Sequence, residues 1–203
     1  MVATSRKPHA TLQPVPDRPL PSTPRELFDS LPPLPGLRTE IIDGRLIVSP
    51  VGTPEHGLLA MRLFRSFIPL MDERGWDAWA GNVDVCVDGP RDPVGPDFVL
   101  APKDCPRWGE RELLSSGLKL VAEVVSRGSA EDDRGKKPGI YAGGGVPVML
   151  LIDPIATPPA VTVFSEPKDG RYHTSASVTF GREIHIPDPV DFTLDTSVFE
   201  EVL

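Results

Sequence analysis

Cysteine is scarce in this chain, and its scarcity excludes two common kinds of small-protein scaffold. The two cysteines among the 203 residues, Cys86 and Cys105, show no CxxC spacing and no neighbouring histidine pattern. A disulfide framework or a zinc knuckle needs several cysteines or histidines at regular spacings. With 39% hydrophobic residues, the chain is instead long enough to bury one sizeable core.

Long apolar runs are missing as well. No stretch reaches the roughly 18 consecutive apolar residues that a membrane-spanning helix needs. The N-terminal sequence MVATSRKPHATLQPVPDRPLPSTP lacks the apolar centre of a secretory signal. We therefore expect a cytoplasmic protein without a membrane partner.

Positive charge is in deficit, since 21 lysines and arginines face 29 acidic residues and the formal net charge is −8. Non-specific binding of nucleic acid depends mainly on neutralising phosphates with Lys and Arg. A broad electrostatic interface for DNA is therefore not expected. Any contact with DNA would have to be local, or depend on metal ions or on a second subunit.

Composition divides the chain into an N-terminal arm and one domain. Residues 1–22 are rich in proline and polar residues without an apolar period, which predicts a disordered arm. A helix is predicted to follow, because Thr23 can cap it, Pro24 suits its first position and Glu26 stands three residues after the cap. Residues 23–203 are expected to form a single domain.

The next segments predict a hairpin and a long helix. Two β-prone runs within residues 39–50 flank Asp43-Gly44, a pair suited to the positive φ angles of a tight turn. Residues 54–75 show helical spacing, with Gly75 as the stop signal. The apolar face predicted to pack on a sheet consists of Leu58, Leu59, Leu63, Phe67, Leu70 and Met71.

Four further segments predict strands, at residues 95–102, 118–126, 147–154 and 159–165. The second and third are almost continuously apolar, which suits central strands covered on both faces. A short helix predicted within residues 130–145 lies between these two. This order implies a crossover unit and an α/β or α+β fold, with a mixed central β-sheet flanked by helices.

Two acidic residues occur in segments that otherwise have the apolar pattern of buried strands. Asp97 lies at the front of PDFVLAP, and Glu123 lies in the middle of LKLVAEVVS. A buried carboxylate is costly unless it is paired or binds a metal. If the strands are neighbours, both side chains can emerge on one face, and a divalent cation between them would remove their repulsion.

The ligand type favours a hard ion. Asp97, Glu123 and Glu40 offer oxygen ligands without nearby Cys or His, which suits Mg²⁺ or Mn²⁺. Lys136 or Lys137 could hold an attacking water or neutralise a phosphoryl oxygen. In the alternative without a metal, Glu123 pairs with Lys137 or Arg134, and Asp97 merely begins a strand.

Several motifs occur together in a recognisable order. They are TEIIDGRLIVSP, PEH, GPDFVL, LVAEVVS, DRGKKPGIYAGGGV and LLIDP, which extend over residues 39–154. In this order they resemble the Uma-type putative restriction endonucleases, a bacterial family of the PD-(D/E)XK nuclease superfamily, and the likeness covers about residues 24–165. The resemblance implies a restriction-endonuclease-like core.

The resemblance also implies a role for individual residues of the metal site. Asp97 corresponds to the aspartate of the family's PD motif and Glu123 to the acid of its ExV strand, both metal ligands. The carbonyl of Val124 would be a backbone ligand, and Glu40 resembles the N-terminal acid that completes the site. In much of the superfamily a lysine stands two residues after the acid, where this chain has Val125.

The family pattern instead carries a lysine on the following helix. The frame is matched by Asp133, Arg134, Lys137, Tyr141 and Gly145. Lys137 is therefore the expected catalytic lysine, with Lys136 as the second candidate and Tyr141 as a supporting residue. Pro138 either distorts this helix or marks its beginning. His56 matches a family histidine that could contact DNA or support Glu40, or could be an ordinary residue at a helix end.

Together these features predict a Mg²⁺-dependent endonuclease that hydrolyses DNA phosphodiester bonds. The alternative is a catalytically inactive nuclease-fold protein that acts as a binding or partner module. A homodimer is expected by analogy, because cutting both strands of a duplex usually needs two sites. The recognition sequence, and the choice between DNA and RNA, do not follow from the sequence.

Overall fold

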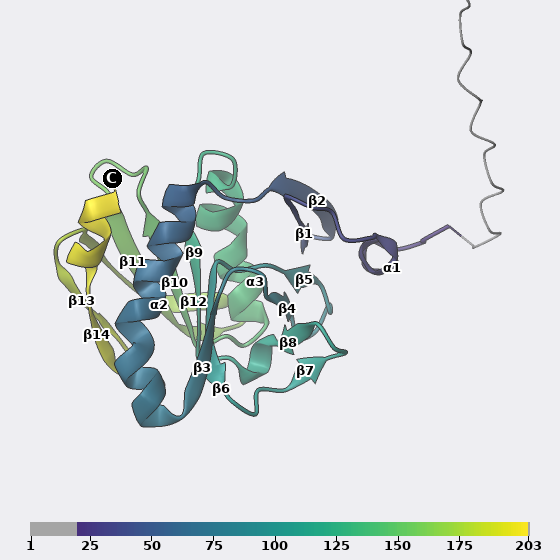
Figure 1. The fold of residues 1–203 in the computed structure, drawn as a ribbon. Coiled ribbons are helices and arrows are strands. Elements are labelled where there is room, and N and C mark those ends of the chain that lie inside the picture. The colour runs from purple at the N-terminus through teal and green to yellow at the C-terminus, as the bar shows by residue number, and fades with distance from the viewer. Residues whose placement is uncertain (1–19, 203) are drawn as a thin grey trace, which may run out of the picture.

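The two most apolar segments of the sequence form adjacent strands at the centre of a mixed sheet (Figure 1). In the computed structural model, which describes residues 20–202, β9 (Leu120–Val124) and β10 (Val148–Asp153) are buried throughout. They are parallel, and helix α3 (Lys137–Gly143) lies in the crossover between them. The predicted crossover unit and fold class are therefore confirmed. Of the predicted arm, residues 1–22, the part up to residue 19 lies outside the residues that the structure describes.

The sheet extends by antiparallel pairing on both sides of this parallel pair. Its order is β12 (Arg171–Thr179), β11 (Ala160–Lys168), β10, β9, β6 (Phe98–Pro102) and β3 (Trp76–Ala80). Asp97 and Glu123 were expected to lie close together if their two strands are neighbours. β6 does lie directly beside β9.

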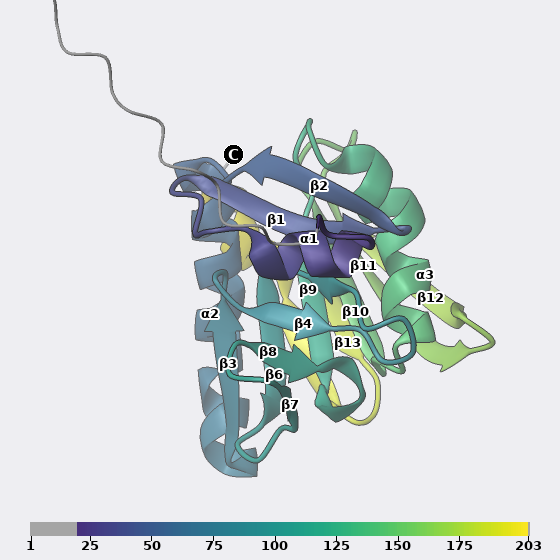
Figure 2. The same ribbon diagram turned by 90° about the vertical axis from the view of Figure 1, so that its right-hand side faces the viewer.

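Different elements cover the two faces of the sheet, and Figure 2 shows α2 (Pro54–Arg74) and α3 on opposite sides of it. The face under α2 is also covered by the hairpin of β13 (Glu183–Ile186) and β14 (Phe192–Asp195) and by the 3₁₀-helix η3 (Thr196–Val202). Successive residues of a strand point to opposite faces. Leu120, Ala122 and Val124 therefore pack under α2, whereas Val121 and Val125 pack on the side of α3.

A small second sheet packs on the side of α3. Its order is β5 (Pro93–Val94), β4 (Asp84–Cys86), β8 (Glu112–Leu114) and β7 (Arg107–Trp108), and the 3₁₀-turn η1 (Ser115–Gly117) follows β8. Val85 and Leu113 of this sheet join Val121 and Met149 of the central strands in one buried cluster.

Helix α2 begins and ends where its sequence signals predict. The Thr53 hydroxyl accepts a hydrogen bond from the backbone N–H of His56, and Gly75 ends the helix with a left-handed φ of 66°. The predicted buried face is correct except at Leu58, which is 44% exposed and lies beside that face. Ala60 takes a buried position instead.

The N-terminal hairpin also forms as predicted. Strands β1 (Leu37–Ile42) and β2 (Arg45–Pro50) pair around Asp43 and Gly44, whose φ angles of 51° and 68° fit the tight turn. Helix α1 (Pro24–Ser30) precedes the hairpin, and its Thr23 hydroxyl accepts from the N–H of Glu26. Figure 2 shows the hairpin lying across the end of the central sheet.

The short helix expected within residues 130–145 consists of two pieces. A π-helical turn, η2 (Asp132–Lys136), is followed directly by α3. Pro138 therefore lies in the first turn of α3, where its missing N–H removes no intrahelical hydrogen bond. Of the two possibilities for Pro138, the helix beginning there is the one observed.

Between residues 20 and 202, none of the helices combines the length and apolar character that crossing a membrane requires.

Phe67 offers a test of the core beneath α2. Its ring is fully buried, 5.4 Å from the ring of Phe98 and 5.0 Å from that of Phe192. Phe67→Ala should lower the free energy of unfolding by about 3–5 kcal/mol, because it leaves a cavity. Leu58→Ala, on the exposed side, should change it by less than about 0.5 kcal/mol. Urea denaturation measures both, and equal effects would contradict this packing.

Candidate active site

Asp97 and Glu123 lie opposite each other at the end of the paired part of β6 and β9. Phe98 pairs with Ala122, and the N–H of Asp97 donates to the Ala122 carbonyl at 3.0 Å. The same register, continued by one residue, sets Asp97 opposite Glu123. Strand alternation then places both carboxylates on the α3 side of the sheet, as expected for neighbouring strands.

Asp97 is buried and held by two hydrogen-bond donors, with the His56 ring beside it. Its carboxylate accepts from the Val124 N–H at 2.8 Å and from the Arg38 guanidinium at 2.9 Å, and the Nε2 of His56 lies 3.0 Å away. Burial by itself would raise the pKa of Asp97. The close contact with His56 and the charge of Arg38 outweigh burial and lower this pKa to about 2. Asp97 is therefore ionised at neutral pH.

Glu123 lies in a very different environment, although it is the neighbour of Asp97. It is buried, the Tyr141 hydroxyl of α3 donates to it, and the ammonium of Lys137 lies 3.0 Å away. Burial raises the pKa of Glu123 well above its usual value, and the charge of Lys137 opposes this only in part. Two adjacent carboxylates thus have strongly different proton affinities.

Lys137 joins three acids from three parts of the chain. Its Nζ lies 3.0 Å from Glu123, 3.1 Å from Asp133 and 3.4 Å from Glu40. Burial opposes the charge of the ammonium, but the carboxylates prevail and raise the pKa of Lys137 above its usual value. Lys137 therefore keeps its proton while these acids are ionised.

The neighbouring Lys136 does not reach the site. Its ammonium pairs with Asp132 at 2.6 Å, and its side chain is substantially exposed. The π-helical turn between β9 and α3 ends at Lys136, so Lys137 is the one that points inward. The structure thus separates two lysines that the sequence left as alternatives. Arg134, the other cation considered for Glu123, pairs with Asp153 instead.

The hairpin contributes the remaining acid. Glu40 on β1 is buried, and its Oε1 accepts from the N–H of Gly95 at 2.9 Å. Arg38, two residues earlier and on the same face of β1, donates to the Gly95 carbonyl at 2.9 Å as well as to Asp97. The hairpin is thereby joined to the segment that leads into Asp97.

Two residues of this cluster, Arg38 and Asp133, were given no role in the site from the sequence, although Asp133 is part of the family frame. Arg38 could have been found from its spacing, because alternation on a strand sets it beside Glu40. Asp133 could have been found from its i,i+4 spacing to Lys137. Asp133 is buried, and beyond the Lys137 ammonium its carboxylate has no hydrogen-bond partner within residues 20–202.

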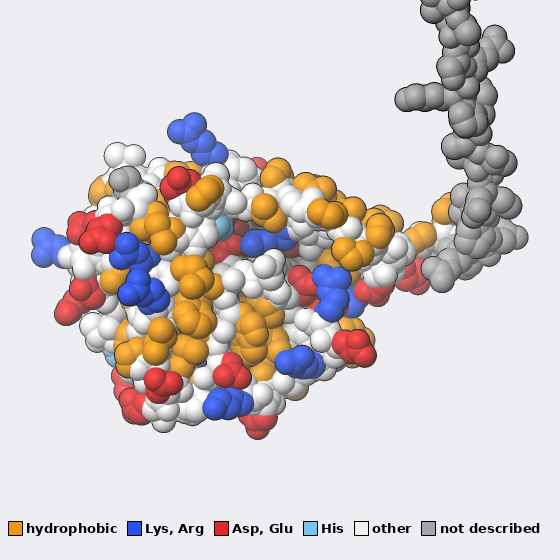
Figure 3. Space-filling model, viewed as in Figure 1, with side chains coloured by type: hydrophobic (Ala, Val, Ile, Leu, Met, Phe, Trp, Pro, Cys, Tyr) orange, Lys and Arg blue, Asp and Glu red, His pale blue; other side chains and the backbone are white. Residues whose placement is uncertain are grey.

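The cluster lies at the wall of a cavity of about 800 Å³ between the hairpin, the start of α2 and the loop after β9. Figure 3 shows a hollow on this face, with acidic and basic side chains at its floor and hydrophobic ones along its rim. A solvent-filled space therefore reaches carboxylates that are otherwise buried. Such an arrangement of perturbed carboxylates in a cleft is typical of a functional site.

The donors fit a hard divalent cation in chemistry and charge. Four buried carboxylates, those of Glu40, Asp97, Glu123 and Asp133, face the charges of Arg38 and Lys137, which leaves an excess of two negative charges when all four are ionised. Within residues 20–202, no three His, Cys, Asp or Glu side chains converge into a complete metal site. Mg²⁺ is usually held by one or two carboxylates together with waters, so two carboxylates suffice.

Comparison with known proteins shows similarity to a protein family and to solved structures. The family model "Uma2: Putative restriction endonuclease" matches residues 25–197. The crystal structure of a putative nuclease belonging to DUF820 from Anabaena variabilis is similar, with a TM-score of 0.68 and 17% sequence identity. The similarity covers 90% of this chain and 100% of that one, and it shows a shared fold. No curated protein matches the sequence.

Lys137 and Lys136 offer a test of the buried cluster. Lys137→Met should lower the free energy of unfolding by about 3–5 kcal/mol at neutral pH, because it leaves buried carboxylates without their counter-charge. Lys136→Met removes an equal charge one position away and should leave stability nearly unchanged. Chemical denaturation of both variants measures this difference. Two equally stable variants would show that Lys137 is not the counter-ion of the cluster.

The lowered pKa of Asp97 predicts a pH dependence of stability. Because the folded-state pKa, about 2, lies below the usual value of 3.8, ionised Asp97 stabilises the fold above about pH 4. This contribution, roughly 2 kcal/mol, is lost as the pH falls through about 2. Unfolding of Asp97→Asn and wild type should therefore differ most above pH 4 and converge in acid. A difference that persists at pH 2 would contradict it.

Proposed function

Because the chain belongs to the Uma2 family of putative restriction endonucleases, we propose that it is a metal-dependent endonuclease that hydrolyses DNA phosphodiester bonds. The observation that carries the proposal is the ammonium of Lys137, held among Glu123, Asp133 and Glu40 on the sheet face that also presents Asp97. A charged donor beside paired carboxylates in an open cavity suits phosphoryl chemistry, in which positioning and charge stabilisation dominate.

Mg²⁺ is the proposed cofactor, and Mn²⁺ would suit the same oxygen donors. Asp97, Glu123 and the Val124 carbonyl would hold the ion, with Glu40 beside them. When bound, the ion would supply Lewis acidity to a phosphoryl oxygen and a lower pKa to a coordinated water. The excess of two negative charges in the cluster supports this assignment.

The residues of the chain have separable roles in this proposal. Arg38 and His56 keep Asp97 ionised and fix its orientation, and the Tyr141 hydroxyl orients Glu123. Lys137, whose raised pKa keeps it protonated, acts as a hydrogen-bond donor that positions the attacking water or neutralises a phosphoryl oxygen. It would not act as a general base.

A second candidate function is binding without cleavage. The observation that favours it is that Arg38, His56 and Lys137 already pair with the carboxylates that would bind a metal. In that case the protein keeps the nuclease fold as a binding or partner module. Residues 23–203 as one domain remain a prediction from length and composition, and a homodimer that cuts both strands of a duplex remains a prediction that rests on analogy.

Cleavage of duplex plasmid DNA and of single-stranded circular DNA in the presence of Mg²⁺ or Mn²⁺ tests the proposal. Asp97→Asn and Glu123→Gln should each reduce the rate by at least about 100-fold, since loss of even an outer-shell partner of a metal costs up to that much. Asp153→Asn is the matched control, because Asp153 also ends a central strand but pairs with Arg134 outside the cluster. Chelation by EDTA should abolish the wild-type activity.

Calorimetry separates the two candidate functions. Binding of Mg²⁺ or Mn²⁺ to the wild type, lost in Asp97→Asn while Asp153→Asn keeps it, is the result expected of the nuclease. No heat of binding at millimolar metal, together with no cleavage, would support the binding module instead. Cleavage that is unchanged in both Asp97→Asn and Glu123→Gln would overturn the assignment of the site.

A further inference from the structure

The lining of the large cavity carries more negative than positive charge. Its acidic side chains are Glu40, Glu55, Asp97, Glu123, Asp132 and Asp133. Its basic side chains are Arg38, Arg127 and Lys137, which leaves an excess of three negative charges among the described residues. Proteins that grip duplex DNA neutralise several phosphates with Lys and Arg. This cavity is not built to follow the phosphates of a duplex.

Two of the three basic side chains are already engaged inside the protein. Lys137 is buried among its carboxylates, and Arg38 donates to Asp97 and to the Gly95 carbonyl. Arg127, on the loop after β9, is the exposed cation among the described lining residues. The number of phosphates that this lining can contact is therefore about one or two, one for each cation that can reach solvent.

The rim of the cavity is aliphatic and exposed. Val48 and Val51 of the hairpin segment are 47% and 56% exposed, and Ile155 on the facing loop is 42% exposed. Figure 3 shows hydrophobic side chains gathered along this hollow. Exposed apolar side chains that gather in one patch often mark a ligand-binding groove. The flat faces of unpaired bases are the apolar part of a nucleic acid.

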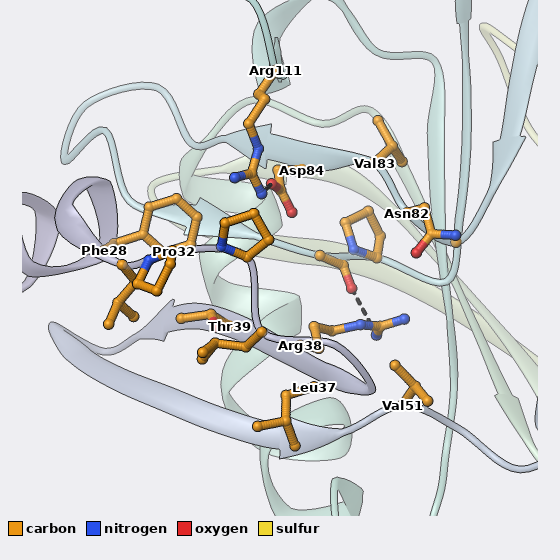
Figure 4. Close-up of a pocket in the computed structure, with 16 residues that line it drawn as sticks. Phe28, Pro32, Leu37, Arg38, Thr39, Val51, Asn82, Val83, Asp84 and Arg111 are labelled. Atoms are coloured by element: carbon orange, nitrogen blue, oxygen red, sulfur yellow. Dashed lines mark hydrogen bonds and ion pairs between the residues drawn. The ribbon is translucent and has the colours of Figure 1, made fainter. Parts of the chain in front are cut away.

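A smaller cavity of about 340 Å³ adjoins the first, and both are lined by Arg38 and Val51. Figure 4 shows Phe28 and Pro32 at one end of it and Asn82 and Val83 at the other, with Arg38 between them. The apolar residues offer contact to a base face, and the Asn82 amide offers donors and an acceptor to a base edge.

Arg38 lies where these two cavities meet. Its guanidinium has five N–H donors, and the bonds to Gly95 and Asp97 use two of its nitrogens. Part of the side chain is exposed, so further N–H groups can face a phosphate. A phosphate at Arg38 would lie beside Asp97, and the bases on either side would reach the two cavities.

We infer that the substrate enters this site as an unpaired, single-stranded segment of nucleic acid, with bases against the aliphatic rim and in the smaller cavity, and one phosphate at Arg38. The inference rests on the proposed function and deepens it by naming the substrate class. A duplex would present phosphates to an acidic lining and keep its bases covered. A single strand also needs only one active site for each cut.

The test compares binding of a fluorescently labelled oligonucleotide with binding of the same sequence as a duplex, by anisotropy with the full chain in EDTA. The single strand should bind at least about 10-fold tighter. Between about 50 and 200 mM salt its affinity should fall with a slope of about −0.7 to −1.4, the value for one or two phosphates.

Two variants that change the charge by the same amount test where the bases bind. Val51→Glu, at the junction of the two cavities, should weaken single-strand binding at least about 10-fold, because a carboxylate replaces apolar contact. Ile68→Glu is the matched control, since Ile68 is 41% exposed on α2 and does not line either cavity. It should bind like the wild type, and circular dichroism checks that both variants are folded.

The possible outcomes show whether the inference fails alone. Preference for the duplex with a slope steeper than about −4.5, the value for five phosphates, would overturn the inference and leave a nuclease of duplex DNA. Equal loss in Val51→Glu and Ile68→Glu would also overturn it, because the effect would then be one of net charge. No binding of either nucleic acid in EDTA would overturn the inference, whereas the proposed function is tested separately by metal-dependent cleavage.

Discussion

The buried ammonium of Lys137 is the interaction on which the candidate site depends. Carboxylates from the hairpin, from β9 and from the turn before α3 meet at this one cation, and none of them could be buried together without a positive charge. The same cluster joins three segments that are far apart in the sequence. It therefore contributes to the tertiary structure and also holds the groups that would perform chemistry.

The packing of the central sheet offsets the free-energy cost of burying this charged cluster, because the strands on which it lies are otherwise apolar and well packed. The central strands β9 and β10 are buried on both faces, and each residue of β9 except Glu123 packs in one of the two hydrophobic clusters. Glu123 is the one position at which the strand departs from this pattern. A single polar residue in such a strand is tolerated because α3 supplies both a hydroxyl and an ammonium to it.

Several parts of this arrangement could be predicted from local sequence. The turn at Asp43 and Gly44, the ends of α2 and the crossover between β9 and β10 follow from φ preferences, caps and apolar runs. The proximity of Asp97 and Glu123 followed from placing two strands side by side. Arg38 was given no role, because its partners Asp97 and Gly95 come from a distant segment, and Asp133 was named only as part of the family frame. Leu58 was placed on the wrong side because helical spacing does not fix the edges of a buried face.

The sequence by itself determined the fold class, the family resemblance and the small set of acids and lysines from which a site could be built, because these depend on local pattern and residue type. Only the tertiary structure decided which lysine faces the site, why the pKa of Asp97 is lowered while that of Glu123 is raised, and that the open cavity is acidic and aliphatic. The physical reason is that proton affinity and access depend on burial and on neighbouring charges from other segments, which no local pattern contains.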